Sequence, residues 1–196
     1  MKTKLQKYKE IVDVSNKEMA ACTIELAEAY LQDYPRNGRV WLELGIALSN
    51  LARYKKATQA IQKAIEYLDT EDHCFCYLYF GHLYKQKGNY KKAIEWYRKA
   101  SDADPDSATY FIYLGGILAT VGKLTEAEEC HRYATKCKEG AIDEAYLNLG
   151  YVLRAQERYD EALLCFEKAI ELDPKYKVAK AALKDMKKLF EIRGLD

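Results

Sequence analysis

The side chains best suited to catalysis or metal binding are those of three histidines and six cysteines. His73, Cys74 and Cys76 stand close together in the sequence and offer three ligand types that zinc accepts. Residues 74 and 76 of a helix point about 200° apart, so their sulfur atoms cannot hold one ion. We therefore expect no metal site and no cofactor.

Catalytic motifs are absent from the sequence. The histidines His73, His82 and His131 lie outside any nucleophile or phosphate-binding pattern, because the chain contains no G-x-S-x-G, no P-loop and no G-x-G-x-x-G. An enzymatic hypothesis would rest on His131 and the cysteines alone. We therefore predict that the protein is not an enzyme.

Composition is typical of a folded protein with solvated helix faces. Apolar residues make up 49% and charged residues 31% of the 196 positions, and the net charge is +1. This balance provides no global field for nucleic acid. Neither a signal peptide nor an apolar run of about 18 residues is present, so we expect a cytoplasmic protein with reduced thiols and no membrane insertion.

The elements that would position any site recur along the chain. Four glycines, Gly45, Gly81, Gly115 and Gly150, are separated by 36, 34 and 35 residues. A large aromatic residue lies four positions before each glycine, at Trp41, Tyr77, Phe111 and Tyr146. Sixteen positions after each glycine come Ile61, Tyr97, His131 and Phe166. A period near 34 predicts stacked pairs of helices that approach closely at each glycine.

This pattern resembles the tetratricopeptide repeat, W-x2-L-G-x2-Y followed by A-x3-F and P. The resemblance implies an all-α fold, a right-handed α-solenoid of antiparallel helix pairs with a C-terminal capping helix. The chain departs from the pattern at His131, which replaces a bulky apolar residue. Ala52 and Glu157 also stand in the turns where two other copies have Gly88 and Gly122.

We predict one solenoid over residues 1–196, composed of a degenerate hairpin at 1–37, repeats at 38–71, 74–107, 108–142 and 143–176, and a capping helix at 177–193. The sequence Ser15-Asn16-Lys17-Glu18 matches a capping box and predicts the start of a helix. The capping helix carries lysines on its outer side, which favours a role in solubility, with docking on acidic lipid or protein as the alternative.

The candidate site follows from the register of the repeats. Tyr79 and Tyr113 lie two residues before a glycine, on the face that first helices of such repeats turn into a concave groove. Neighbouring groove positions complete the predicted partner-binding set: Arg39, Leu42, Phe75, Leu78, Tyr79, His82, Lys85, Ile112, Tyr113, Leu147, Asn148, Tyr151 and Arg154. Packing between adjacent repeats is the alternative role for these residues.

Related repeats of heat-shock co-chaperones hold a terminal carboxylate with a lysine three residues before the glycine. Here that position holds Leu42, Leu78, Ile112 and Leu147, and only Asn148 matches the clamp. We therefore do not expect a chaperone tail to bind by a carboxylate clamp. The groove is instead expected to be apolar with a slight basic lean, since Arg39, Lys85 and Arg154 face only Glu43 and Glu144.

The sequence predicts a protein-protein interaction scaffold or adaptor. A partner segment with apolar anchors, extended or helical, would lie in the groove. Two alternatives stay open: a self-assembling structural homo-oligomer, and a secretion-type chaperone for a hydrophobic client. The fold alone does not choose among them.

Overall fold

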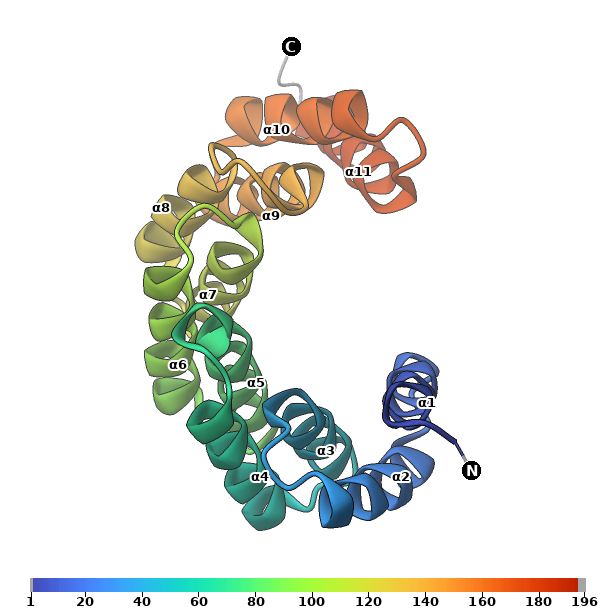
Figure 1. Ribbon diagram of the computed structural model, residues 1–196. Helices are drawn as coiled ribbons and strands as arrows, with labels where there is room; N and C mark the ends of the chain where they lie inside the picture. The colour runs from blue at the N-terminus through green and yellow to red at the C-terminus, as the bar shows by residue number, and fades with distance from the viewer. Residues whose placement is uncertain (1, 194–196) are drawn as a thin grey trace. The chain divides into compact units, whose positions relative to one another are not determined.

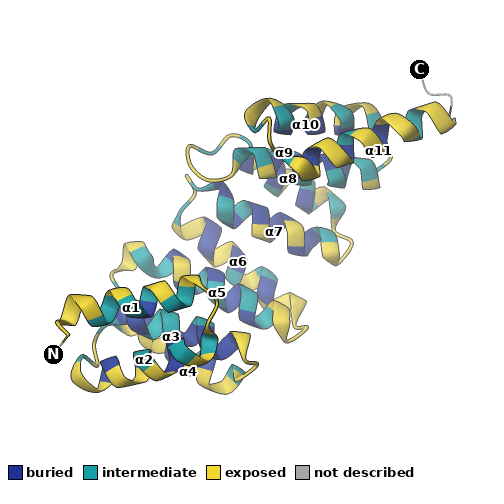
Figure 2. Ribbon diagram, turned by 90° about the vertical axis from the view of Figure 1, so that its right-hand side faces the viewer, coloured by how far each residue is buried: buried dark blue, intermediate teal, exposed yellow. Residues whose placement is uncertain are grey.

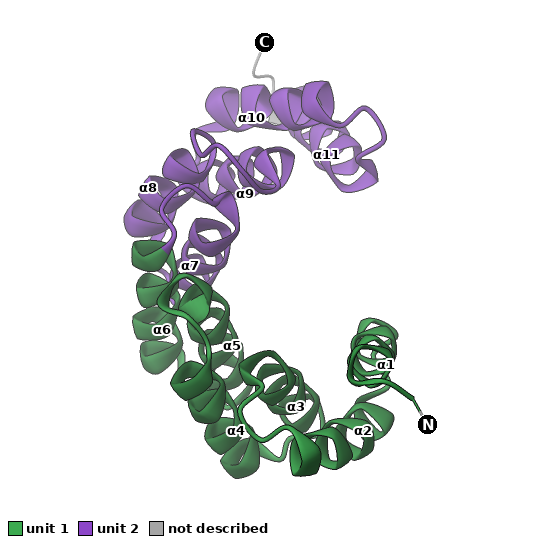
Figure 3. Cartoon of the chain, in the orientation of Figure 1, with its two compact units in different colours: residues 1–103 green, residues 104–196 purple. Residues whose placement is uncertain are grey.

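The structure is a computed structural model that describes residues 2–193. Within this range the chain forms eleven α-helices, one short 3-10 turn and no strand. The predicted all-α fold is confirmed. The chain divides into two compact units, Met1–Ala103 and Asp104–Asp196 (Figure 3).

Unit 1 consists of three helical hairpins, α1 with α2, α3 with α4, and α5 with α6 (Figure 1). Their bounds are α1 Lys4–Asn16, α2 Ala20–Asp33, α3 Gly38–Asn50, α4 Tyr54–Tyr67, α5 His73–Gln86 and α6 Tyr90–Ala103, with the 3-10 turn η1 at Thr70–Asp72. Unit 2 has two hairpins and a final helix: α7 Ala108–Thr120, α8 Leu124–Ala134, α9 Ile142–Ala155, α10 Tyr159–Leu172 and α11 Lys177–Arg193.

The two helices of a repeat meet where a glycine of the first helix lies against a large residue of the second. A Cβ atom at Gly150 would lie 2.5 Å from Cε1 of Phe166, and one at Gly45 would lie 2.6 Å from Cγ1 of Ile61. A Cβ atom at either position would force the side chain of Phe166 or Ile61 to shift, so glycine is strongly favoured there. The spacing of sixteen residues in the sequence thus marks a close contact within the hairpins α3–α4, α5–α6, α7–α8 and α9–α10.

The turns within the hairpins share one backbone conformation. Gly88 and Gly122 have φ angles of +71° and +81°, and Ala52 and Glu157 adopt the same left-handed region at +56° and +62°. A left-handed residue ends the first helix and reverses the chain. An L-residue there costs about 1–2 kcal/mol, which packing of the hairpin must offset.

The start of α2 differs from the sequence prediction. Ser15 does not begin a helix but lies in the last turn of α1, and α2 begins at Ala20 without a side-chain cap. Glu18 has a φ angle of +55°, so it cannot occupy the third position of a helix as a capping box requires. The capping box of this region instead joins Thr3 and Gln6. The hydroxyl of Ser15 is thereby left for a tertiary contact.

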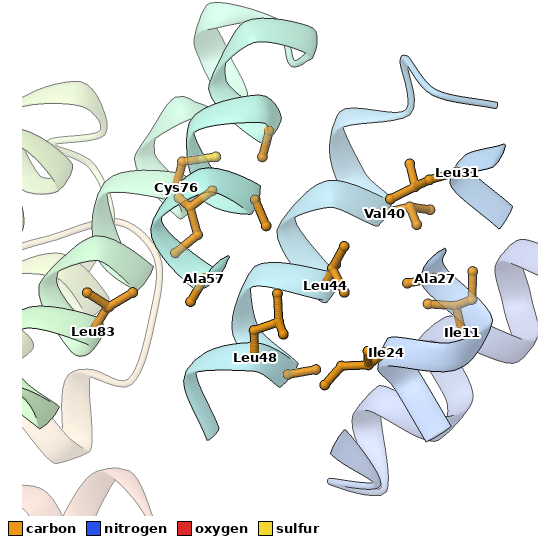
Figure 4. Packing of buried hydrophobic residues seen from close by; sticks show 14 of the residues in the cluster. Ile11, Ile24, Ala27, Leu31, Val40, Leu44, Leu48, Ala57, Cys76 and Leu83 are labelled. Atoms are coloured by element: carbon orange, nitrogen blue, oxygen red, sulfur yellow. The ribbon is translucent and has the colours of Figure 1, made fainter. Parts of the chain in front are cut away.

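The cores are built from the facing sides of the helices, where Figure 2 shows the buried residues. In unit 1, Ile11 of α1 packs with Ile24 and Ala27 of α2, and the cluster continues through Val40 and Leu44 (Figure 4). In unit 2 a second cluster joins α9, α10 and α11 through apolar residues that include Leu153, Phe166, Ala179, Ala182 and Met186. Burial of these faces holds each stack together.

His131 occupies the position of Phe166 in its own repeat, and its side chain is 1% exposed. The ring lies under Gly115, and its Nδ1 atom is buried without a hydrogen-bond partner. Burial lowers the pKa of His131 to about 4, so the ring is neutral at pH 7. An unpaired polar atom at the close contact between α7 and α8 weakens this repeat.

The adjacent glycines of α7 provide a test of the close approach. Gly115→Ala should destabilise the protein by about 1–3 kcal/mol, because the new Cβ would lie 2.6 Å from two atoms of the His131 ring. Gly116→Ala should instead stabilise it by about 0.5–1 kcal/mol, because Gly116 is exposed and no atom lies within 4 Å of its Cβ position. Chemical denaturation of both variants would measure these opposite signs, and equal effects would contradict this account.

Replacing His131 with phenylalanine should raise stability at pH 7 by about 1 kcal/mol or more, because it removes the unpaired nitrogen. The pKa of His131 in the folded protein, about 4, lies below its ordinary value of 6.5. As the pH is lowered, His131 is therefore protonated in the unfolded state before it is protonated in the folded state. The stability of the wild type therefore falls as pH decreases from 6.5 to 4. His131→Phe should show a smaller fall in denaturation curves over this range. An unchanged slope would argue against a buried neutral His131.

Candidate partner-binding site

A small pocket lies in unit 1 between α1, α3 and α5 and has a volume of about 190 Å³. We call it the α1–α3–α5 pocket. Four predicted groove residues line it, namely Arg39, Leu42, Phe75 and Tyr79. The other lining residues are Tyr8, Glu43, Ile46, Leu68 and Asp72. The pocket therefore combines aromatic rings, aliphatic side chains and three charged groups.

Glu43 is the most unusual of these groups. Its carboxylate is partly buried and accepts a hydrogen bond of 2.5 Å from the hydroxyl of Ser15. Burial raises the pKa of Glu43, and the hydrogen bond from Ser15 partly offsets the effect. The contact also ties the end of α1 to α3, so the first helix of the chain forms one wall of the pocket.

The remaining two charges of the pocket neutralise each other. Arg39 donates from Nη2 to Oδ2 of Asp72 over 2.9 Å, which links α3 to the turn η1. Because the lining holds two carboxylates and one guanidinium group, Glu43 leaves a surplus of one negative charge. The predicted slight basic lean of the groove therefore does not hold at this point.

Two of the predicted aromatic groove residues expose a substantial part of their side chains to solvent. Phe75 is 44% exposed in unit 1 and Tyr113 is 38% exposed in unit 2. Tyr79 is half-buried, and its ring centroid lies 5.6 Å from that of His82. Aromatic side chains in such positions offer a large apolar area at low entropic cost to a partner.

The predicted positions three residues before the glycines differ from these. Leu78, Ile112 and Leu147 are buried, and only Leu42 retains partial exposure beside the pocket. The three buried side chains pack within their units, so they support the site and offer little surface to a partner. The alternative of packing between repeats thus describes them better than direct contact.

His82 and Lys85 lie further along α5. Nδ1 of His82 lies 2.9 Å from the hydroxyl of Tyr97, and burial together with the nearby charge of Lys85 lowers the pKa of His82 to about 4. The imidazole is neutral at pH 7 and can accept a hydrogen bond from Tyr97. Lys85 itself is exposed.

In unit 2 the predicted residues of α9 form a separate group. The ring of Tyr151 meets Phe166 edge-on at 5.3 Å between centroids, and the guanidinium group of Arg154 lies 5.3 Å from the centre of the Tyr151 ring. Asn148 is half-buried on the same helix. The cation-π pair of Arg154 and Tyr151 lies on a partly exposed, polar part of α9. It differs from the α1–α3–α5 pocket, whose lining has a surplus of negative charge.

The two cysteines that flank Phe75 in the sequence are structural. Cys74 donates weakly to the carbonyl oxygen of Glu71, and Cys76 is fully buried. Burial raises the pKa of Cys76 to about 12, so the thiol stays protonated and is a poor nucleophile or metal ligand. Among residues 2–193, no group of three or more His, Cys, Asp and Glu side chains could hold a metal ion.

A larger hollow of about 660 Å³ lies elsewhere in unit 1, around Trp41 and the helices α2 and α4. Its charged lining residues are Glu28, Glu66, Lys56 and Lys63, so their charges cancel. The indole N–H of Trp41 already donates to the carbonyl oxygen of Pro35 over 2.7 Å. This hollow therefore lacks the uncompensated group that distinguishes the α1–α3–α5 pocket.

The sequence pattern does not assign Tyr8, Ser15 or Asp72 to the site, because these residues lie outside the regular repeats. The register of the repeats already places Glu43 in the groove, since it precedes Gly45 by two residues, as Tyr79 precedes Gly81. The register of the repeats therefore locates Glu43, whereas its hydrogen-bond donor, Ser15, depends on where α1 packs.

Antiparallel helical pairs with three-residue turns and a glycine at each close contact define a helical-repeat protein. Sequence profiles described as tetratricopeptide repeats match residues 38–67, 81–130 and 143–176. The chain belongs to the tetratricopeptide repeat family. Such repeats are generally scaffolds for protein-protein interaction.

Similar proteins share the repeats. The human "Protein O-mannosyl-transferase TMTC1" is 30% identical over 138 residues, which cover 70% of this chain but only 14% of that protein. The solved structure of TTC0263, a thermophilic TPR protein of Thermus thermophilus, has a TM-score of 0.70 at 17% identity and covers 94% of this chain and 98% of its own. That of YrrB, described as "a TPR protein with an unusual peptide-binding site", has a TM-score of 0.63 at 18% identity and covers 93% and 92%. These structures share the fold.

A helix that crosses a membrane needs about 20 mostly apolar residues. In the part of the chain that the structure describes, no helix has the length and apolar character needed for such a crossing.

Removing the Ser15 hydroxyl should weaken the link between α1 and α3. In Ser15→Ala the partly buried Glu43 carboxylate loses its donor, which should cost about 1–3 kcal/mol of stability. Hydrogen exchange should show faster opening of α1. Asn16→Ala, at the neighbouring exposed position, is the control. If both variants exchanged alike, Glu43 would not be what holds α1 in place.

Proposed function

We propose that this protein is a non-enzymatic interaction scaffold whose first helices bind a segment of a partner protein through apolar anchors. The observation that carries the proposal is the exposure of Phe75 and Tyr113 on first helices, where neighbouring positions are buried. Large aromatic side chains left outside a core that could have covered them are typical of binding surfaces.

The α1–α3–α5 pocket supports the same proposal for unit 1. Aromatic and aliphatic side chains from three helices converge there, and Arg39 forms an ion pair with Asp72 in its lining. A site built on helices is preorganised, which lowers the entropic cost of binding. YrrB, a protein of similar fold, is described as having a peptide-binding site, which is consistent with a peptide segment as ligand.

The positions that carry lysines in a carboxylate clamp have no lysine in this chain, so a chaperone tail is not the proposed ligand. Leu42, Leu78, Ile112 and Leu147 stand at those positions, and three of the four are buried. An anionic terminus would therefore meet aliphatic side chains there. Internal apolar segments suit this surface better.

The test uses the intact chain to recover a partner, followed by titration of the purified pair. Replacing Tyr79 and Tyr113 together with alanine should weaken binding by about 2 kcal/mol or more, because each removes an aromatic anchor. Circular dichroism should show the same helical content in the variant and the wild type.

Tyr90→Ala is the matched control, since Tyr90 is 41% exposed but begins the second helix α6. This control should bind like the wild type. A dissociation constant unchanged by the double substitution, or changed equally by Tyr90→Ala, would refute binding through the first helices.

A further inference from the structure

We propose that the bound partner segment presents an arginine or lysine side chain to the α1–α3–α5 pocket, where its cation pairs with Glu43 beside the rings of Phe75 and Tyr79. The inference rests on the proposed function and adds the chemistry of one anchor. It stands on the charge, size and lining of the pocket.

The charge of the lining favours a cation. Asp72 already pairs with Arg39 over 2.9 Å, whereas Glu43 receives a hydrogen bond from the uncharged hydroxyl of Ser15. One negative charge of the lining is therefore not neutralised by a cationic side chain of the pocket. A partner carboxylate would be repelled at this place, and an apolar side chain would leave the charge desolvated.

The environment of Glu43 makes a cationic partner more favourable than it would be at the surface. The carboxylate is partly buried, and burial raises its pKa. A cation within hydrogen-bond distance would compensate for the lost hydration, and charge-assisted hydrogen bonds are stronger than neutral ones. Ser15 would keep one carboxylate oxygen in place while the cation approaches from the pocket.

The aromatic lining suits the same group. Phe75 and Tyr79 of α5 and Tyr8 of α1 line the pocket together with Glu43. Aromatic faces attract ammonium and guanidinium groups through their quadrupole. The aliphatic stem of lysine or arginine can lie along Leu42 and Ile46, as such stems commonly cover apolar surface.

The size of the pocket argues for one side chain. Its volume of about 190 Å³ is below the roughly 300–1,000 Å³ of pockets that enclose small-molecule ligands. A cofactor would not be enclosed, whereas a single long side chain projecting from a bound segment can enter.

Benzamidinium chloride is a suitable probe, because it combines a ring with a planar cation, and benzamide is its neutral counterpart. In NMR titrations of the intact chain, benzamidinium should shift resonances of Phe75 and Tyr79 saturably, and benzamide should bind more weakly by a factor of about ten or more. Glu43→Gln, which keeps the size of the side chain and its acceptor for Ser15, should weaken benzamidinium binding by about the same factor.

Glu144→Gln is the control, since Glu144 is an exposed carboxylate on the first helix α9, and it should leave probe binding unchanged. Equal binding of the two probes, or full affinity in a folded Glu43→Gln variant, would overturn the cation site. Loss of partner binding in the tyrosine variant tests the scaffold function separately. The scaffold proposal can thus survive the failure of this inference.

Discussion

The close contact between a glycine of one helix and a bulky residue of the next is the constraint on which each repeat depends. At Gly150 the ring of Phe166 comes so near that a methyl group would not fit. This contact sets the distance between the two helices and thereby the direction of their other side chains. The groove residues lie on the same first helices as these glycines, so the packing that closes each hairpin also decides which of them reach the surface.

His131 shows the limits of this constraint. The repeat accepts an imidazole where others have isoleucine, tyrosine or phenylalanine, although Nδ1 remains unpaired. Burial keeps the ring neutral by lowering its pKa. A bulky flat group is thus sufficient to fill the space beside glycine, and polarity is tolerated at a cost in stability.

The α1–α3–α5 pocket depends on a helix outside the regular repeats. α1 contributes Tyr8 to the lining and the Ser15 hydroxyl to Glu43. Without this donor the carboxylate would be partly buried and unpaired, which is unfavourable. The N-terminal hairpin therefore does more than cover the end of a core, because it shapes the chemistry of the neighbouring repeat.

The sequence by itself determined the helical pairs, the positions of their closest contacts and the family, because glycine and bulky residues at fixed spacing leave few other packings. It also indicated the exposed aromatic positions Phe75 and Tyr113 by register. Only the tertiary structure decided that Leu78, Ile112 and Leu147 are buried, and that Ser15 binds Glu43 instead of capping a helix. The physical reason is that burial and hydrogen bonding of these groups depend on side chains far away in the chain, which a local pattern does not encode.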